Sequence, residues 1–509
     1  MSVALDPEIR PIDHIVEYGE LHAPALILRD RTLTYQDLRQ RIGALAAWLQ
    51  AKVPVKGARV ASWAAKGELT CLLPLAAARA GLVHVPINPL LKHMQVSYIL
   101  DDCEAALLLG NAGRLSSLGP EDISEGCELV DEVELWVGVG AMASELPLSD
   151  ADPEALAALL YTSGSTGRPK GVMLSHANLW LGAVSVAHYL GMENDDVVLA
   201  VLPLSFDYGQ NQLFNAWRAG ASVVPLDYLT PRDVIKACAR HQITTIAAVP
   251  PLWVQLIEQD WPNEATMSIR RLTNSGGALT TDLIGGLRRI FPQARLFPMY
   301  GLTEAFRSTY LDPSLVDSHP TSMGRAIPFA EILVIQEDGM ETLPNEEGEL
   351  VHCGPLVAQG YWHDAVRTAE RFRPAPDVSA YGGTAVWSGD RVRRDENGLL
   401  YFVGRRDAMI KSAGNRISPQ EVEDAARDTG LVSEAIAIGV PDVRLGQAVH
   451  LVVRGATGTD DTQQDELAAI LARELPNFMR PHKIHWRDTM PLNPNGKIDR
   501  VALAEELGA

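Results

Sequence analysis

Cysteine is scarce in this 509-residue chain: there are five cysteines, an odd number, and none has Cys-x-x-Cys spacing. This pattern excludes a disulfide framework and a structural zinc site, and it favours a reducing compartment. Long apolar runs are also missing, because no stretch approaches the ~20 residues that a membrane span needs. The N-terminus lacks the basic and then apolar segments of a signal peptide. The sequence therefore predicts a cytoplasmic protein without a membrane span.

Positive charge is in deficit, since 44 Lys and Arg residues face 64 Asp and Glu residues, giving a net charge of -20. This balance argues against nucleic acid or an anionic membrane surface as a partner. A single local cluster of amides and cations remains compatible with binding a small anion. The hydrophobic content of 47% is that of an ordinary globular protein. The chain length predicts two or more domains.

Strand and helix patterns alternate along the first part of the chain, which implies parallel sheets covered by helices. Residues 111–153 are weakly patterned, and we expect loops and an edge element there. From residue 350 the spacing of glycine and aromatic residues predicts short antiparallel strands. Strands are predicted at 59–63, 82–87, 105–109, 197–202, 223–226 and 243–249, and helices at 34–49, 69–80 (started or kinked by Pro74), 96–100 and 176–190.

A domain boundary is predicted near Gly404-Arg405-Arg406-Asp407. Beyond it, Ser418-Pro419-Gln420-Glu421 has the form of a capping box that begins a helix. Strands at 435–440 and 449–453 and a helix at 465–474 follow, which suffices for a small domain. The expected fold class is α/β, with a large N-terminal domain (1–406) of α/β sheets plus an antiparallel subdomain, and a small α+β C-terminal domain (407–509).

Residues 161–171 concentrate groups that bind anions. Apolar runs before and after this stretch predict a hairpin, whose tip can present backbone amides, hydroxyls and a charged lysine to one point. A Walker A loop is excluded because Gly171, not Ser or Thr, follows Lys170. Most glycine-rich turns are flexible surface loops, but the flanking strands and Lys170 favour a polyphosphate ligand here. The hydroxyl and glycine positions are Thr162, Ser163, Gly164, Ser165, Thr166 and Gly167.

Two further motifs carry candidate chemistry. In Met299-Tyr300-Gly301-Leu302-Thr303-Glu304, the tyrosine can stack on a purine, the threonine can reach a phosphate and the glutamate can hold Mg²⁺. In Trp387-Ser388-Gly389-Asp390, the aspartate can accept both ribose hydroxyls. Taken alone, the first is an unremarkable strand-end turn and the second a solvated turn.

The motifs together resemble the AMP-forming adenylating superfamily, which includes acyl-CoA synthetases, adenylation domains of peptide synthetases and beetle luciferases. The glycine-rich hairpin is similar to its phosphate-binding loop, and Met299–Glu304 to its Tyr-Gly-x-Thr-Glu motif. Near the C-terminus, Asn493–Arg500 resembles its Pro-x-x-Gly-Lys motif. Matching motifs run from the Leu33-Thr34-Tyr35 region to Arg500 in the family's order.

The resemblance implies a role for each matched residue. It places Lys497 on a mobile small domain with Asp407 as the hinge, and it implies ATP and Mg²⁺ as cofactors with Glu304 on the metal. The implied catalytic residues are Lys170, Thr303, Glu304 and Lys497. The implied nucleotide-binding residues are Thr162, Ser163, Gly164, Ser165, Thr166, Gly167, Gly276, Gly277, Tyr300, Gly301, Asp390 and Arg405. The implied substrate-binding residues are Phe206, Asp207, Tyr208, Met299 and Arg307.

One position bears on the substrate. Acyl-CoA synthetases commonly carry His where Phe206 stands, whereas amino-acid-activating members carry Phe-Asp, and their Asp pairs with the substrate's ammonium group. Asp207 therefore points to an amino acid, although an Asp there can also simply cap a helix. Arg307 is an odd neighbour for a hydrophobic pocket, and it can bind a second carboxylate or pair with Asp207.

The predicted function is an AMP-forming ligase that adenylates a carboxylic acid, with an amino acid favoured. The acyl group then passes to the phosphopantetheine thiol of a separate carrier protein. The alternative is an acyl-CoA synthetase for an aryl or aliphatic acid. A luciferase-like oxygenase and a non-catalytic binding paralogue are less favoured, the latter because Lys170, Thr303, Glu304, Asp390 and Lys497 are all present. A monomer or a homodimer is expected.

Overall fold

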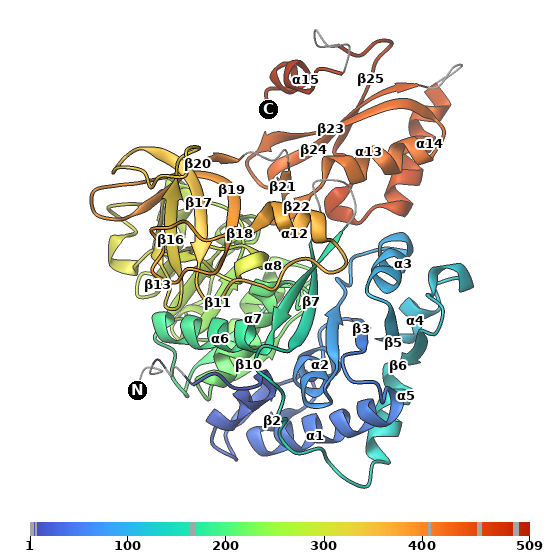
Figure 1. The fold of residues 1–509 in the computed structure, drawn as a ribbon, viewed down its shortest axis with the longest axis vertical. Helices are drawn as coiled ribbons and strands as arrows, with labels where there is room; N and C mark the ends of the chain where they lie inside the picture. Colours follow the sequence, from blue (N-terminus) through green and yellow to red (C-terminus); the bar gives the residue numbers. More distant parts are fainter. Residues whose placement is uncertain (1–4, 6–7, 163–168, 406–408, 456–460, 492–497) are drawn as a thin grey trace.

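The computed structural model describes residues 5, 8–162, 169–405, 409–455, 461–491 and 498–509, and at 405, 461 and 462 only the backbone. Figure 1 shows a large body of sheets and helices with a smaller C-terminal unit at one end. This arrangement confirms the expected fold class of a large N-terminal α/β domain and a small α+β domain. The boundary at 406/407 stays a prediction, because residues 406–408 lie outside the described part.

The first sheet has six strands in the order β6-β5-β3-β4-β7-β8. Its strands pair in parallel except β7 and β8, which form the predicted antiparallel hairpin. The bounds are β3 (Arg59–Trp63), β4 (Val83–Pro86), β5 (Ala105–Gly110), β6 (Glu128–Asp131), β7 (Leu156–Thr162) and β8 (Lys170–Ser175).

Two sequence expectations for this region need correction. Residues 111–153 supply the edge strand β6, as expected, but also the helices α4 (Ala112–Leu115) and α5 (Glu132–Gly140). Helix α5 forms because the Asp131 side chain accepts hydrogen bonds from two backbone amides of its first turn. Helix α2 (Glu68–Arg79) continues through Pro74, and every one of its residues is buried. That packing compensates for the hydrogen bond that the proline cannot donate.

The second sheet joins a parallel block to an antiparallel one. Its main order is β16-β17-β19-β20-β15-β14-β13-β12-β11-β9-β10-β1-β2, with β18 beside β19. The parallel block runs from β1 to β13. Its strands are β1 (Pro24–Ile27), β9 (Val197–Ala200), β10 (Ser222–Pro225), β11 (Thr245–Ala248), β12 (Arg271–Asn274) and β13 (Arg295–Tyr300). At the edge of this block, β2 (Thr32–Thr34) pairs antiparallel with β1. The antiparallel strands are β14 (Thr309–Tyr310), β15 (Ser322–Ala326), β16 (Glu331–Ile335), β17 (Glu347–Cys353), β18 (Phe372–Pro374), β19 (Thr384–Arg394) and β20 (Leu400–Arg405).

Helices of the large domain bury many apolar side chains, and every residue of α2 is buried. Helix α6 keeps the predicted bounds, because Ser175 caps its start and Gly191, with φ +60°, ends it. The remaining helices are α1 (Tyr35–Lys52), α3 (His93–Asp102), α6 (His176–Leu190), α7 (Asp207–Arg218), α8 (Pro231–His241), α9 (Pro250–Ile257), α10 (Asn263–Thr266), α11 (Thr281–Ile290) and α12 (Ala365–Arg371).

The C-terminal unit has a five-stranded sheet, β22-β21-β24-β23 with β25 beside β24, and an apolar core of its own. The backbone amide of Glu421 donates to the Ser418 hydroxyl at 3.4 Å, which confirms the serine half of the predicted capping box; among the described residues the Glu421 side chain makes no return bond to the Ser418 amide. Its elements are β21 (Ile410–Ser412), β22 (Asn415–Ile417), α13 (Pro419–Asp428), β23 (Val432–Asp442), β24 (Gly446–Gly455), α14 (Asp461–Glu474), β25 (Lys483–Trp486) and α15 (Arg500–Leu507). No helix of the described chain is both long and apolar enough to cross a membrane.

Candidate active site

The glycine-rich hairpin places a hydroxyl and an ammonium group on facing strand ends. Thr162 ends β7 and is paired in register with Lys170, the first residue of β8. The Thr162 hydroxyl oxygen is buried and has no hydrogen-bond partner among the described residues. Ser163, Gly164, Ser165, Thr166 and Gly167 lie outside the described residues, so their predicted role is untested.

A network of three side chains joins this hairpin to the Tyr-Gly-x-Thr-Glu motif. Lys170 Nζ donates to Glu304 Oε1 at 3.1 Å and to the Tyr361 hydroxyl at 2.6 Å. The Tyr361 hydroxyl donates to Glu304 Oε1 at 2.7 Å, and Lys170 Nζ lies 4.0 Å from the centre of the Tyr361 ring. The structure thus brings two predicted site residues together through a third, Tyr361, that the sequence analysis missed.

The charge balance around Glu304 keeps its carboxylate ionised. Burial raises the pKa of Glu304, but the positive charges of Lys170, Arg371 and Arg416 outweigh burial and hold that pKa well below its ordinary value. Burial lowers the pKa of Lys170, and the Glu304 carboxylate opposes this change. Glu304 Oε2 is buried, and no described residue forms a hydrogen bond with it. A buried carboxylate oxygen of this kind is suited to a cation that arrives with a ligand.

A second pair of predicted residues meets at the end of β13. The Tyr300 hydroxyl donates a hydrogen bond to the buried carboxylate of Asp390 on β19. Asp390 is in register with Arg405 on β20, so the two residues with predicted ribose contacts lie on neighbouring strands. The Tyr300 ring, the Asp390 carboxylate and the Arg405 backbone therefore lie near one another, as expected for a nucleoside site.

The two predicted glycines, Gly276 and Gly277, follow β12, where they lie close to the side chains of Val249 and Pro250. Gly276 has φ +80°, and an added Cβ would lie 3.7 Å from the carbonyl oxygen of Gly414 in the C-terminal unit. At Gly277 a Cβ would lie 3.0 Å from the Pro250 ring. A side chain at Gly276 would strain the backbone because of its positive φ, and one at Gly277 would press on the Pro250 ring of the same domain.

All five residues predicted to bind the acid line one cavity of about 1040 Å³: Phe206, Asp207, Tyr208, Met299 and Arg307. Asp207 is the first residue of α7, so Phe206 rather than Asp207 occupies the cap position. Asp207 is 6% exposed, and its carboxylate accepts a hydrogen bond from the Thr303 hydroxyl at 3.2 Å. Burial raises the pKa of Asp207, and the nearby charge of Arg307 opposes this rise.

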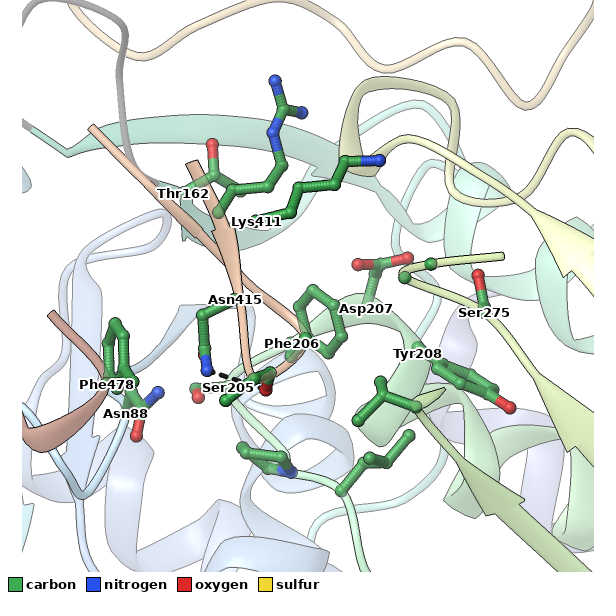
Figure 2. Close-up of a pocket in the computed structure, with 18 of the residues that line it drawn as sticks. Asn88, Thr162, Ser205, Phe206, Asp207, Tyr208, Ser275, Lys411, Asn415 and Phe478 are labelled. Carbon is green, nitrogen blue, oxygen red and sulfur yellow. Dashed lines mark hydrogen bonds between the residues drawn. The ribbon is translucent and has the colours of Figure 1, made fainter. Parts of the chain in front are cut away.

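The C-terminal unit contributes to the same cavity. Its hairpin β21–β22 supplies Lys411 and Asn415, and Phe478 comes from the segment after α14. Figure 2 shows these side chains together with Asp207 and Thr162 of the large domain. Lys497 and Asp407 lie outside the described residues, so the predicted lysine and hinge have no observed place here.

Some residues of the site were not predicted from the sequence. Tyr361 is 191 residues from Lys170 and 57 from Glu304. Arg371 stands on α12 and Arg416 on β22, and both act on Glu304 through their charge. Neither motif spacing nor hydrophobic period marks Tyr361 and Arg371, because only long-range packing brings them to the site.

With this geometry in hand, comparison with known proteins identifies the family. Residues 16–362 match the model of the AMP-binding enzymes, and residues 421–497 match the C-terminal domain of AMP-binding enzymes. The chain therefore belongs to the AMP-binding enzyme family and is an AMP-forming acid–thiol ligase.

Among curated proteins, the chain is similar to two enzymes named L-proline–[L-prolyl-carrier protein] ligase. It is 30% identical to the one from Pseudomonas fluorescens over 494 residues, covering 95% of this chain and 96% of that protein. It is 32% identical to the one from Streptomyces coelicolor over 529 residues, covering 98% of this chain and 96% of that protein.

Among solved structures, the fold is similar to o-succinylbenzoate CoA synthetase from Bacillus subtilis. A double mutant of that enzyme bound to its product analogue superposes with a TM-score of 0.85, at 26% identity and with 98% of this chain and 99% of that chain covered. The same enzyme in complex with its acyl-adenylate intermediate gives a TM-score of 0.70, at 26% identity and 97% and 98% coverage.

Proposed function

We propose that this ligase activates an amino acid with ATP and transfers the aminoacyl group to the phosphopantetheine thiol of a separate carrier protein. The observation that carries the proposal is the buried Asp207 carboxylate on the cavity wall, 3.2 Å from the Thr303 hydroxyl. A desolvated ammonium group needs such a partner, whereas a simple acid does not. The names of the two carrier-protein ligases support the same substrate and acceptor classes.

In the first half-reaction, a carboxylate oxygen of the substrate attacks the α-phosphorus of ATP, and pyrophosphate leaves. We assign the phosphates to the hairpin after Thr162 and to Lys170, and the nucleoside to Tyr300, Asp390 and Arg405. Lys497 is assigned to the charge that develops as the carboxylate attacks, because a fixed cation stabilises that charge. Tyr361 positions Lys170 and Glu304 relative to each other.

Mg²⁺ fits this site as a cation shared with the phosphates. Within the described residues, no group of three or more His, Cys, Asp or Glu side chains is arranged to hold a metal. Magnesium does not require such a group, since it usually binds one or two carboxylates together with substrate phosphates. Glu304 is the residue that would hold it, through the buried Oε2, which has no hydrogen-bond partner in the described part of the chain. When bound, the ion would offset negative charge on the phosphate oxygens.

In the second half-reaction, the thiol sulfur attacks the acyl carbonyl, a thioester forms and AMP leaves. Hairpin β21–β22 lines the cavity in the present arrangement. The higher TM-score to the product-analogue complex than to the acyl-adenylate complex supports assigning this arrangement to thiol transfer. A change between two arrangements requires a hinge, for which Asp407 remains our candidate.

The proposal is tested by measuring pyrophosphate release across amino acids and their deaminated analogues, followed by transfer to a phosphopantetheinylated carrier protein or to CoA. We expect release with an amino acid and loading of the carrier protein. Preference for a deaminated acid, with CoA as acceptor, would instead support an acyl-CoA synthetase, the candidate that the CoA synthetase structures favour. A cytoplasmic location and a monomeric or dimeric state remain predictions.

A further inference from the structure

Arg307 is a buried cation on the wall of the acid-binding cavity. Its side chain is 1% exposed, and its guanidinium lies 4.5 Å above the centre of the Tyr208 ring. Its Nε is a buried donor without a hydrogen-bond partner, and among the described residues no hydrogen bond from its guanidinium is present. A guanidinium has five N–H donors and is always charged. The cavity therefore holds an unusually under-satisfied positive group.

The backbone holds Arg307 in place through a tight turn. Phe306 has φ 57° and ψ -62°, and the Arg307 amide donates to the Ala305 carbonyl at 2.6 Å, which together form a γ-turn of the strained kind. The Phe306 ring is fully buried, and a Cβ at position 182 would lie 2.3 Å from it, so the ring packs directly on Gly182. Strain of this kind persists where packing enforces it, and it often marks functional sites.

Asp207 does not satisfy Arg307. Its charge interacts with that of Arg307 at longer range, but no ion pair within 4.0 Å joins these two described residues, and the hydrogen bond to Asp207 comes from Thr303. In the adenylate the substrate's α-carboxyl carries no charge, and its ammonium group is assigned to Asp207. Arg307 is then left without a counter-charge, which is costly in a buried site.

We propose that the substrate is an amino acid whose side chain ends in a second carboxylate, and that Arg307 binds this carboxylate. The inference rests on the proposed amino acid activation and deepens it. A planar guanidinium donates two parallel hydrogen bonds to a carboxylate, and the Tyr208 ring, 4.5 Å from the Arg307 guanidinium carbon, limits where that fork can lie. Proline, named in the two relatives, has no group for Arg307, so the proposal separates this chain from them.

The test is ATP–pyrophosphate exchange with aspartate, glutamate, asparagine, glutamine and proline, and with succinate and glutarate as diacids that lack the amine. We expect the wild-type enzyme to favour an acidic amino acid over its amide by roughly 100-fold in kcat/KM, as expected for one buried charge partner. Arg307→Met should remove most of that preference, and Arg307→Lys should restore part of it because the charge returns.

Arg218→Met is the matched control, since the Arg218 guanidinium also stacks on a tyrosine, 3.8 Å above Tyr18, outside the cavity lining. The control should leave the acid-to-amide ratio unchanged. If the wild-type enzyme prefers proline or another neutral amino acid, this inference is wrong while the proposed function stands. If it prefers a diacid or another acid without an amine, both are wrong. The wild-type panel decides this even if the Arg307 variants do not fold.

Discussion

Replacing Tyr361 with phenylalanine tests the network that the sequence did not predict. The substitution removes one hydroxyl, which accepts from Lys170 at 2.6 Å and donates to Glu304 at 2.7 Å. The aromatic ring remains, so its packing against Phe372 and its contact with the Lys170 ammonium are retained. The direct contact between Lys170 and Glu304, 3.1 Å long, also remains.

The expected magnitude follows from these contacts. A hydrogen bond to a charged group contributes about 1.5–3 kcal/mol, and retention of the Lys170–Glu304 pair limits the loss to about one such bond. That free energy corresponds to a fall of roughly 10- to 150-fold in kcat/KM. The assay is ATP–pyrophosphate exchange with the substrate that the screen identifies.

Tyr310→Phe serves as the control, because Tyr310 stacks on Tyr189 at 4.3 Å and does not line the cavity. This variant should exchange pyrophosphate as fast as the wild-type enzyme. If Tyr361→Phe also keeps wild-type kcat/KM and an unchanged KM for ATP, the hydroxyl does not position Lys170 and Glu304 for the reaction. The reasoning from this network would then be refuted.

Three further predictions follow. Lys497→Ala should slow adenylate formation by roughly 10²–10³-fold, measured as pyrophosphate release, because a fixed cation is lost. ATP titration should show that ATP still binds. Unchanged pyrophosphate release would remove Lys497 from the mechanism. Asp207→Ala should lower kcat/KM for the amino acid by roughly tenfold or more and affect the deaminated analogue far less; equal losses would contradict ammonium pairing. Burial raises the pKa of Glu421 from 4.5 to about 8, with a contribution from Asp424. The folded protein therefore keeps a proton that the unfolded chain releases, and stability should fall as pH rises from 4.5 to 8. Unfolding temperatures across this range should show a smaller decline in Glu421→Gln, and identical declines would contradict the assignment.

Sequence reasoning succeeded where the signal is local. The hairpin around residues 163–168 follows from two short apolar runs, and helix α6 follows from a capping serine and a terminal glycine. It was less complete at residues 111–153, where the aspartate cap of α5 outweighed a weak hydrophobic pattern. Pro74 lies inside α2 rather than at its start, and burial of the whole helix cannot be read from one residue.

For the candidate site, the sequence predicted many of the residues that take part but not how their side chains pair. The residue types in the motifs indicated a nucleotide, a carboxylate partner and an acid-binding wall, and the structure places Phe206, Asp207, Tyr208, Met299 and Arg307 on one cavity. The sequence left open whether Arg307 pairs with Asp207. That question depends on side-chain distances between α7 and the turn after β13, which no spacing along the chain encodes.

By itself, the sequence determined the order of the motifs, the kinds of groups available and the alternation that builds parallel sheets, since each depends on residues close together in the chain. The tertiary structure alone decided which of those groups meet. It brought Tyr361 between Lys170 and Glu304, left Arg307 without a hydrogen-bonding partner among the described residues, and placed hairpin β21–β22 on the cavity. These outcomes depend on packing between distant segments, where burial and charge are set by neighbours that the local sequence does not name.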